Sequence, residues 1–319
     1  RIEGYQNFCN KLWNATKFVL MNTENFDPLA DIELSVIDRW MISKTHDLVG
    51  QTEFALETFR FDIFANNIYE FAWHEYCDWY LELTKPLLWD TNTTAAQREG
   101  TKRTLLHILE SLLRIAHPVI PFITETLWHE VAPKLGIQQD TIMLQSYPRT
   151  EDYHSDVEAV AQVEWLKAVI SGIRTIRGEA NIKPSQEIKV IFQGGGEQDR
   201  QRAADTEVML KRLANVQDIR WIDPNSAAPP NALALVKDLK VMVPLAGLID
   251  VVAEQARLDK EIGKAEQDLK RITAKLNNKG FVDKAPAAVV GKERDKATAL
   301  RARIQTLTEQ VDQLTTLGT

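Results

Sequence analysis

Cysteines and long apolar runs are scarce in this sequence of 319 residues. Only two cysteines occur, Cys9 and Cys77, and there is no Cys-x-x-Cys motif, which excludes the usual zinc sites. Two distant cysteines beside aromatic residues indicate buried free thiols in a reducing compartment, so we expect a cytoplasmic protein. No apolar run approaches the roughly 20 residues that a membrane-spanning helix requires, and the sequence therefore predicts no membrane span.

Catalytic and metal-binding motifs are also missing. The triple glycine at 194–196 lies between a predicted strand and a predicted helix, but no Lys-Ser/Thr follows it, and Glu197 and Asp199 would repel a phosphate. His74 and Asp78 lie one helical turn apart without a third ligand, which favours a structural histidine over a metal site. We therefore expect no catalytic residue, metal or cofactor in this chain. Its N-terminus lacks an initiator Met and a signal pattern, which is typical of the interior of a longer protein.

The last 67 residues contain two runs of apolar residues at heptad spacing. A first run of apolar residues has 4-3-4-3-4 spacing and consists of Leu258, Ile262, Ala265, Leu269, Ile272 and Leu276. A second run has 3-4-3-4-3 spacing and consists of Ala297, Leu300, Ile304, Leu307, Val311 and Leu314. The Asn-Asn-Lys-Gly break at 277–280 suits the end of a helix, and Pro286 keeps the second helix from starting before about Ala287. The pattern predicts an antiparallel coiled-coil hairpin.

The hairpin sequence is also basic, unlike the rest of the chain. Residues 257–303 hold 13 Lys and Arg against seven Asp and Glu, a net charge of +6, whereas the whole chain carries −7. This asymmetry indicates an arm that binds a polyanion. Mixed Lys and Glu are equally ordinary on a solvated coiled coil, so charge alone leaves both interpretations open.

Residues 1–150 predict a bundle of long helices. Apolar stripes at helical spacing place these helices at about 8–22, 34–48, 53–84, 105–116 and 121–131. The third helix is expected to begin near Glu53 and to end before Pro86. Six of the eight tryptophans lie in this region, and aromatic residues at this spacing are typical of a core.

Residues 151–250 predict a small α/β linking module. A helix is expected at 157–177 and another at 200–213, with strands at 187–192, 219–222, 232–236 and 239–243. The predicted fold class is thus mainly α: a helical bundle at 1–150, this module at 151–250, and the hairpin arm at 251–319.

Four stretches of the bundle resemble class I aminoacyl-tRNA synthetases for branched aliphatic amino acids. They read Tyr-Gln-Asn-Phe-Cys-Asn-Lys-Leu-Trp-Asn-Ala at 5–15, Asp-Arg-Trp-Met at 38–41, Glu-Tyr-Cys-Asp-Trp-Tyr-Leu-Glu at 75–82 and His-Pro-Val-Ile-Pro-Phe-Ile-Thr-Glu at 117–125. Further similar stretches are Ile-Arg-Thr-Ile-Arg at 173–177 and Asn-Ile-Lys-Pro-Ser at 181–185. The hairpin, with Gly-Phe-Val at 280–282 and Ala-Pro at 285–286, resembles the C-terminal region of bacterial-type valyl-tRNA synthetases in particular.

This resemblance implies that the chain binds tRNA, and valine tRNA in particular, without aminoacylating it. The bundle would contact the anticodon stem-loop and the hairpin the outer corner of the tRNA. The family's catalytic signatures have no counterpart in this sequence. The parent protein would therefore be a valine–tRNA ligase that uses ATP and magnesium, and its other partners would be the missing catalytic and editing domains.

Candidate RNA contacts follow from the residue types. Polar and aromatic side chains that can stack on or hydrogen-bond to anticodon bases are Asn14, Lys17, Arg39, Trp40 and Lys44; core packing is the competing interpretation for Trp40, and helix packing for Asn14. On the hairpin, the expected contacts to the tRNA corner are Lys264, Arg271, Lys275, Lys279, Lys292 and Arg303, together with Phe281 at the tip, which could equally pack under the turn.

Two alternatives remain open at this point. The hairpin could pair with another coiled coil as a protein-interaction module, for which a second apolar stripe is expected, and none is found in the sequence. The chain could also be the equivalent region of an isoleucyl or leucyl synthetase. Isoleucyl relatives commonly end in a cysteine-rich zinc module, so two lone cysteines argue against that choice.

Overall fold

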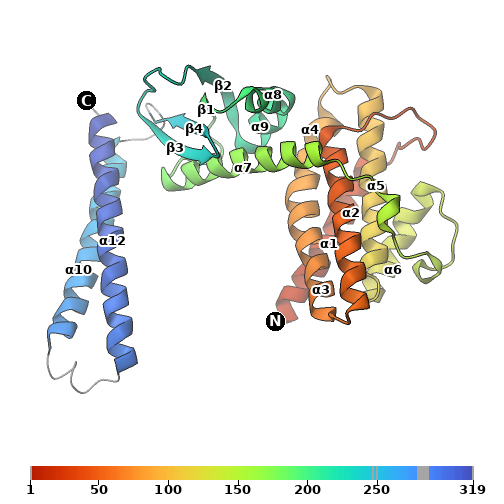
Figure 1. Ribbon diagram of the computed structural model, residues 1–319, viewed down its shortest axis with the longest axis horizontal. Helices are drawn as coiled ribbons and strands as arrows, with labels where there is room; N and C mark the ends of the chain where they lie inside the picture. The colour runs from red at the N-terminus through yellow and green to blue at the C-terminus, as the bar shows by residue number, and fades with distance from the viewer. Residues whose placement is uncertain (1, 246–247, 249–250, 279–286, 318–319) are drawn as a thin grey trace. The chain divides into compact units, whose positions relative to one another are not determined.

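The computed structural model of the chain describes residues 2–245, 248, 251–278 and 287–317 (Figure 1). It divides into two compact units: Arg1–Ser171 with Gly196–Ala214, and Gly172–Gly195 with Asn215–Thr319. The expected fold class is confirmed, because long helices dominate and one small sheet is present. The domain boundaries at 150 and 250 stay a prediction.

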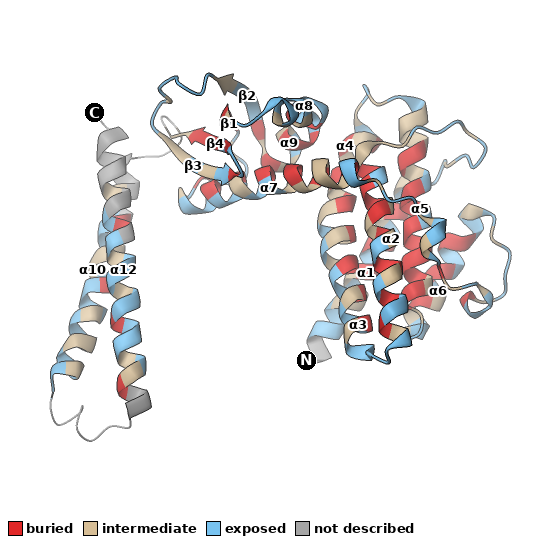
Figure 2. Cartoon of the chain, viewed as in Figure 1, coloured by how far each residue is buried: buried red, intermediate tan, exposed pale blue. Residues whose placement is uncertain are grey.

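The first unit is a bundle of long helices. Its helices are α1 (Ile2–Asn22), α2 (Val36–Glu57), α3 (Phe61–Glu70), a π-helix (Phe71–Tyr80), α4 (Leu81–Trp89), α5 (Ala95–Ala116), α6 (Pro121–Val131), and the pair α8 (Glu197–Asp205) and α9 (Glu207–Ala214). Short 3₁₀ turns follow α6 at Ala132–Leu135, Ile142–Leu144 and Thr150–Asp152. Buried residues line the inward stripes of these helices (Figure 2), as the apolar spacing predicts.

The predicted third helix is wrong at both ends. Glu53 belongs to α2, and the chain turns at Phe59, whose backbone φ is 56°. A left-handed turn at a residue other than glycine leaves no sequence signal, so the helical period continues across it. Pro86 does not end the helix either, because it lies inside α4, where Leu83, Pro86 and Leu88 are buried. Packing of this apolar face outweighs the backbone hydrogen bond that proline cannot form.

The second unit contains a four-stranded sheet of order β2-β1-β4-β3. The strands are β1 (Ile188–Gly194), β2 (Val216–Ile222), β3 (Asn231–Val236) and β4 (Leu239–Pro244); β1 pairs with β2 in parallel and with β4 antiparallel, and β3 pairs antiparallel with β4. All four strand predictions are confirmed. The helix α7 (Val157–Glu179) contributes residues to both units.

The triple glycine at 194–196 has a structural role at the end of β1. Gly194 has a φ of 76°, and a Cβ there would lie 2.8 Å from the carbonyl oxygen of Asp238, so only glycine fits. The next amide, of Gly195, donates to the same carbonyl at 3.2 Å, and the Gly196 amide donates to the Asp199 carboxylate at 2.7 Å. Two of the loop's amides are therefore already engaged within the protein, which agrees with its rejection as a phosphate-binding loop.

The hairpin consists of α10 (Val251–Asn277) and α12 (Ala287–Leu317), which pack antiparallel. Leu258, near the start of α10, forms a buried cluster with Leu307, near the end of α12, and Ile262 and Val311 pack against it. The predicted seam is thus present and the antiparallel pairing is confirmed. The predicted end of the first helix is confirmed, because α10 ends at Asn277 and Asn278 is no longer helical, whereas Lys279 and Gly280 lie outside the described residues.

A buried carboxylate ties three elements of the bundle together. Asp38, at the start of α2, is fully buried and accepts hydrogen bonds from Tyr80 Oη (2.9 Å) in the π-helix and from Thr101 Oγ1 (2.9 Å) in α5. It also accepts from the amide and hydroxyl of Ser35, which caps α2 in return. Burial raises the pKa of the Asp38 carboxyl above its usual value, although these hydrogen bonds act in the opposite direction.

Replacing Asp38 should cost much more stability than replacing its capping partner. We expect Asp38→Ala to lower the free energy of unfolding by about 3 kcal/mol, because it leaves two buried hydroxyls without their acceptor. Ser35→Ala, which removes only the cap, should cost about 1 kcal/mol. Urea unfolding of both variants measures this difference. Equal losses would show that Asp38 acts only as a capping residue.

Candidate nucleic-acid interface

The exposed cations of the hairpin lie away from its apolar seam. Lys264 and Arg271 are seven residues apart on α10, so their side chains share one face about 10 Å apart along the helix. Both are exposed, as is Lys292 on α12. Among the residues that the structure describes, no acid lies within ion-pair distance of Lys264 or Lys292, whereas Arg271 pairs with Asp268 at 3.0 Å. Lys264 and Lys292 can therefore bind a phosphate without giving up an internal partner.

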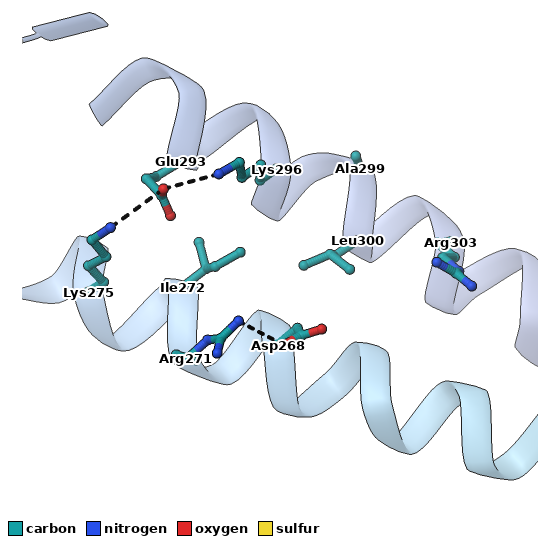
Figure 3. A pocket seen from close by; sticks show the side chains of 9 residues that line it. All are labelled: Asp268, Arg271, Ile272, Lys275, Glu293, Lys296, Ala299, Leu300 and Arg303. Carbon is teal, nitrogen blue, oxygen red and sulfur yellow. Dashed lines mark hydrogen bonds and ion pairs between the residues drawn. The ribbon is translucent and has the colours of Figure 1, made fainter. Parts of the chain in front are cut away.

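A cleft of about 590 Å³ opens between the two helices of the hairpin (Figure 3). Ile272 and Leu300 point into it, and the cations around it include Lys275, Lys296 and Arg303. Each of these cations has an acid beside it: Lys275 and Lys296 flank Glu293 at 3.5 and 3.3 Å, and Arg303 pairs with Glu261 at 3.2 Å. All of them remain partly exposed, so these pairs stabilise the hairpin only weakly and can exchange partners.

Glu293 is the one acid among these that occupies a seam position. It falls on the heptad series that runs through Val290, Ala297 and Leu300, and its side chain is only 13% exposed. Its partial burial would raise the pKa of the carboxyl, but the hydrogen bonds and charges of Lys296 and Lys275 outweigh this, and the pKa is lowered. Sequence analysis misses this position because a charged residue interrupts the apolar pattern.

Three of the five residues expected to contact the anticodon have partners within the protein. Trp40 is fully buried, and its Nε1 donates to Glu164 at 3.4 Å. Lys44 lies 3.7 Å from both Glu75 and Glu164, and Arg39 pairs with Asp156 at 2.9 Å. The structure therefore favours the core interpretation of Trp40, whose ring has no free face for a base, and gives Arg39 and Lys44 structural partners.

The other two anticodon candidates lie on α1 and are exposed. Asn14 lines a shallow cleft of about 210 Å³ with residues of α1, the π-helix and α4, including Lys11, Cys77 and Glu82. Lys17 lies beside the ring of Trp13, 5.9 Å from its centroid. Because Trp40 is buried, the five candidates do not all lie on the surface, and their contacts with RNA stay a prediction.

Two of the hairpin candidates, Lys279 and Phe281, lie outside the described residues, so the structure does not say whether Phe281 packs under the turn. Of the other candidates, Lys264, Arg271, Lys275, Lys292 and Arg303 are all exposed on the described hairpin.

Two family models match separate parts of the chain. Residues 38–192 match the family model described as the anticodon-binding domain of tRNA ligase, and residues 250–315 match the one described as the valyl tRNA synthetase tRNA binding arm. A valine–tRNA ligase of Xylella fastidiosa (strain M12) is 44% identical over 328 aligned residues, which cover 97% of this chain and 33% of that protein.

The chain carries the anticodon-binding domain and the tRNA-binding arm of the valyl-tRNA synthetase family. The chain spans about a third of the length of the valine–tRNA ligase that it matches. The resemblance inferred from the sequence is thus confirmed, and the hairpin matches the model whose description names valyl tRNA synthetase.

The described residues hold neither a cluster of metal ligands nor a membrane-spanning helix. No group of three or more His, Cys, Asp and Glu side chains gathers there as a metal ion would require. His74 instead hydrogen-bonds Asp78 at 3.1 Å, and Asp78 also pairs with Lys11. No described helix is long and apolar enough to cross a membrane.

The seam position of Glu293 predicts a stabilising substitution in the valyl arm. Glu293→Leu should raise the denaturation midpoint of the hairpin, because leucine at a seam position buries apolar surface that the charged residue leaves open. Asp295→Leu, at an exposed position of the same helix, should leave the midpoint unchanged. Hydrogen exchange of α10 and α12 across a denaturant series measures both. A lower midpoint for Glu293→Leu would mean that its pairs with Lys275 and Lys296 outweigh burial.

Proposed function

We propose that this chain binds tRNA with both the bundle and the hairpin, and that valine tRNA is its natural partner. One observation carries the proposal: two separate parts of the chain match tRNA-binding models, and one of these models is specific to valyl-tRNA synthetases. The net charge of +6 over residues 257–303 supports it, since the rest of the chain is acidic.

The mechanism we infer is positioning. The hairpin supplies most of the affinity, through exposed Lys and Arg side chains that contact phosphates regardless of sequence. The bundle supplies discrimination, because unpaired bases are recognised by stacking and by hydrogen bonds to their edges. Together they hold the tRNA so that its acceptor end reaches a catalytic domain in the rest of the longer protein, which would also bind ATP and magnesium. The chain by itself would not aminoacylate tRNA.

We also propose that the protein works in the cytoplasm. Cys9 and Cys77 are free and half-buried, and burial raises the pKa of the Cys77 thiol to about 12. A thiol that stays protonated is a poor nucleophile for disulfide formation, which suits a protein of a reducing compartment.

Titration with valine tRNA and isoleucine tRNA across a range of salt concentrations tests the proposal. Affinity should fall steeply with salt and should be higher for valine tRNA. Lys264→Ala should weaken binding of both tRNAs alike and lower the slope of log K against log salt by about one unit, because one phosphate contact is lost. Lys134→Ala, an exposed cation of the bundle that the proposal does not use, is the matched control.

The other outcomes of this titration separate the alternatives. Equal affinity for both tRNAs with a steep salt slope would leave a clamp for the tRNA corner without discrimination. Absence of binding at micromolar protein and low salt would contradict the proposal and favour a protein-interaction hairpin.

A further inference from the structure

The packing of the hairpin seam changes along its length. At the base of the hairpin, near the start of α10 and the end of α12, Leu258 and Leu307 are buried in one cluster. In the middle of the seam (263–276 of α10 and 293–304 of α12), the buried residues are the two alanines Ala265 and Ala297. An alanine buries much less apolar surface than a leucine does. The middle of the seam therefore holds the two helices together more weakly than the base.

The larger apolar side chains do not close the middle of the seam. Ile272, Leu300 and Ile304 are only half-buried, and the cleft of about 590 Å³ opens at the first two of them (Figure 3). Closely interdigitated side chains oppose the sliding of one helix along the other, whereas small side chains beside an open cleft leave space for it. The hairpin thus has a closely packed base and a loosely packed middle.

A glycine occupies α10 where this change of packing begins. Gly263 follows Ile262, which packs on the base cluster, and lies inside the unbroken helix Val251–Asn277. Among the described residues beyond its chain neighbours and the backbone of its own helix turns, nothing lies within 4 Å of a Cβ built there. No left-handed backbone requires a glycine either, since the residue continues the α-helix. Glycine inside a helix is less favourable than alanine and leaves the backbone freer to bend.

Two ion pairs between the helices place Gly263 at the boundary between the base and the rest of the hairpin. Glu261, two residues before it, pairs with Arg303 of α12 at 3.2 Å. Lys275, twelve residues after it, pairs with Glu293 at 3.5 Å. Because the helices are antiparallel, the part of α12 that faces α10 beyond Gly263 is the part before about residue 303. We call this part of both helices (264–278 and 287–302) the outer half.

Most of the cations expected to contact tRNA lie on the outer half. Lys264 is the residue directly after Gly263, Arg271 and Lys275 follow on the same helix, and Lys292 lies on α12. All four are exposed. A change of backbone angle at Gly263 would therefore move these cations together, while the base cluster stays packed.

We propose that the hairpin bends at Gly263, so that its outer half turns on a fixed base while α12 slides along the alanine part of the seam. The use of this bend in tRNA binding rests on the proposed function: it lets the cations of the outer half adjust to the positions of the phosphates. Hinges of this kind are formed by a few residues that absorb a change of backbone angle. Alanine at position 263 would shift the equilibrium between bent and straight helix about fivefold towards the straight form, by its higher helix propensity.

Distances within the full chain test the bend without tRNA. Spin labels are attached at Ala256→Cys and Ala274→Cys, two exposed positions on α10 that lie about 27 Å apart along a straight helix, after Cys9 and Cys77 are replaced by alanine. The distribution of distances between the labels should be broad, and Gly263→Ala should narrow it. Gly291→Ala, at another helical glycine of the hairpin where a Cβ would meet nothing within 4 Å, is the matched control and should leave the distribution unchanged. Equal widths with Gly263 and with alanine would overturn the bend.

Hydrogen exchange in the chain with both cysteines intact gives a second measurement. The amides of residues 264–267 bond to carbonyls of residues 260–263 and so span the proposed bend. Gly263→Ala should slow their exchange about fivefold and leave the amides of residues 271–275 unchanged. Equal slowing along the whole of α10 would overturn a bend localised at this residue.

A tRNA titration then separates the bend from the proposed function. Gly263→Ala should weaken the binding of valine tRNA about fivefold although it stabilises the helix, because the bound form is bent; Gly291→Ala should leave the affinity unchanged. If Gly263→Ala narrows the distances without weakening tRNA binding, the role of the bend in binding is overturned and tRNA binding stands. If the distances narrow but no form of the chain binds tRNA, the proposed function fails and the bend itself stands.

Discussion

The fit of α7 on the bundle depends on one cluster of compensated charges. Lys167 on α7 lies 2.9 Å from Glu75 of the π-helix and 3.1 Å from Glu164 of its own helix, and Lys44 of α2 lies 3.7 Å from both acids. The ammonium of Lys167 also lies over the rings of Trp40 and Trp79. Removing either carboxylate would leave two cations sharing one acid in a partly buried site, and an uncompensated buried charge is costly. Charge inside the bundle is therefore engaged in packing, and exposed cations on other surfaces remain to contact RNA.

The same cluster shows which property of the candidate site the sequence could not predict. Arg39, Trp40 and Lys44 have the composition of an RNA-binding surface, but their partners Asp156 and Glu164 lie more than 100 residues further along the chain. Periodicity shows which side of a helix is polar. It does not show whether that side meets solvent or a charged helix from elsewhere in the sequence. The chain turn at Phe59 was missed for a related reason, because it depends on a backbone conformation that no glycine marks.

The hairpin was predictable because its structure is local. Among the described residues, each hairpin helix packs mainly on the other, so heptad spacing specifies the seam. The short connection between the two runs makes the pairing antiparallel. Leu258 meets Leu307 where that pattern places them. The predicted run left out Val290 and the charged seam position of Glu293, whose role depends on Lys275 of the facing helix. The bundle, which buries several faces of each helix, required tertiary information that periodicity does not contain.

Exposed and enclosed cations have different consequences for the affinity of the proposed tRNA binding and for its discrimination. Cations such as Lys264 and Lys292 stand on the surface of the hairpin, where salt at physiological strength screens charges beyond about 8 Å. Short-range contacts to a base in a partly apolar cleft of the bundle, such as the one that Arg103 and Ile108 line, are screened less by salt. Raising the salt concentration therefore removes sequence-independent affinity faster than it removes recognition of a base. A protein built in this way discriminates best when its electrostatic attraction to all tRNAs is only moderate. In this chain the net positive charge is confined to the hairpin and the rest is acidic, which keeps that attraction moderate.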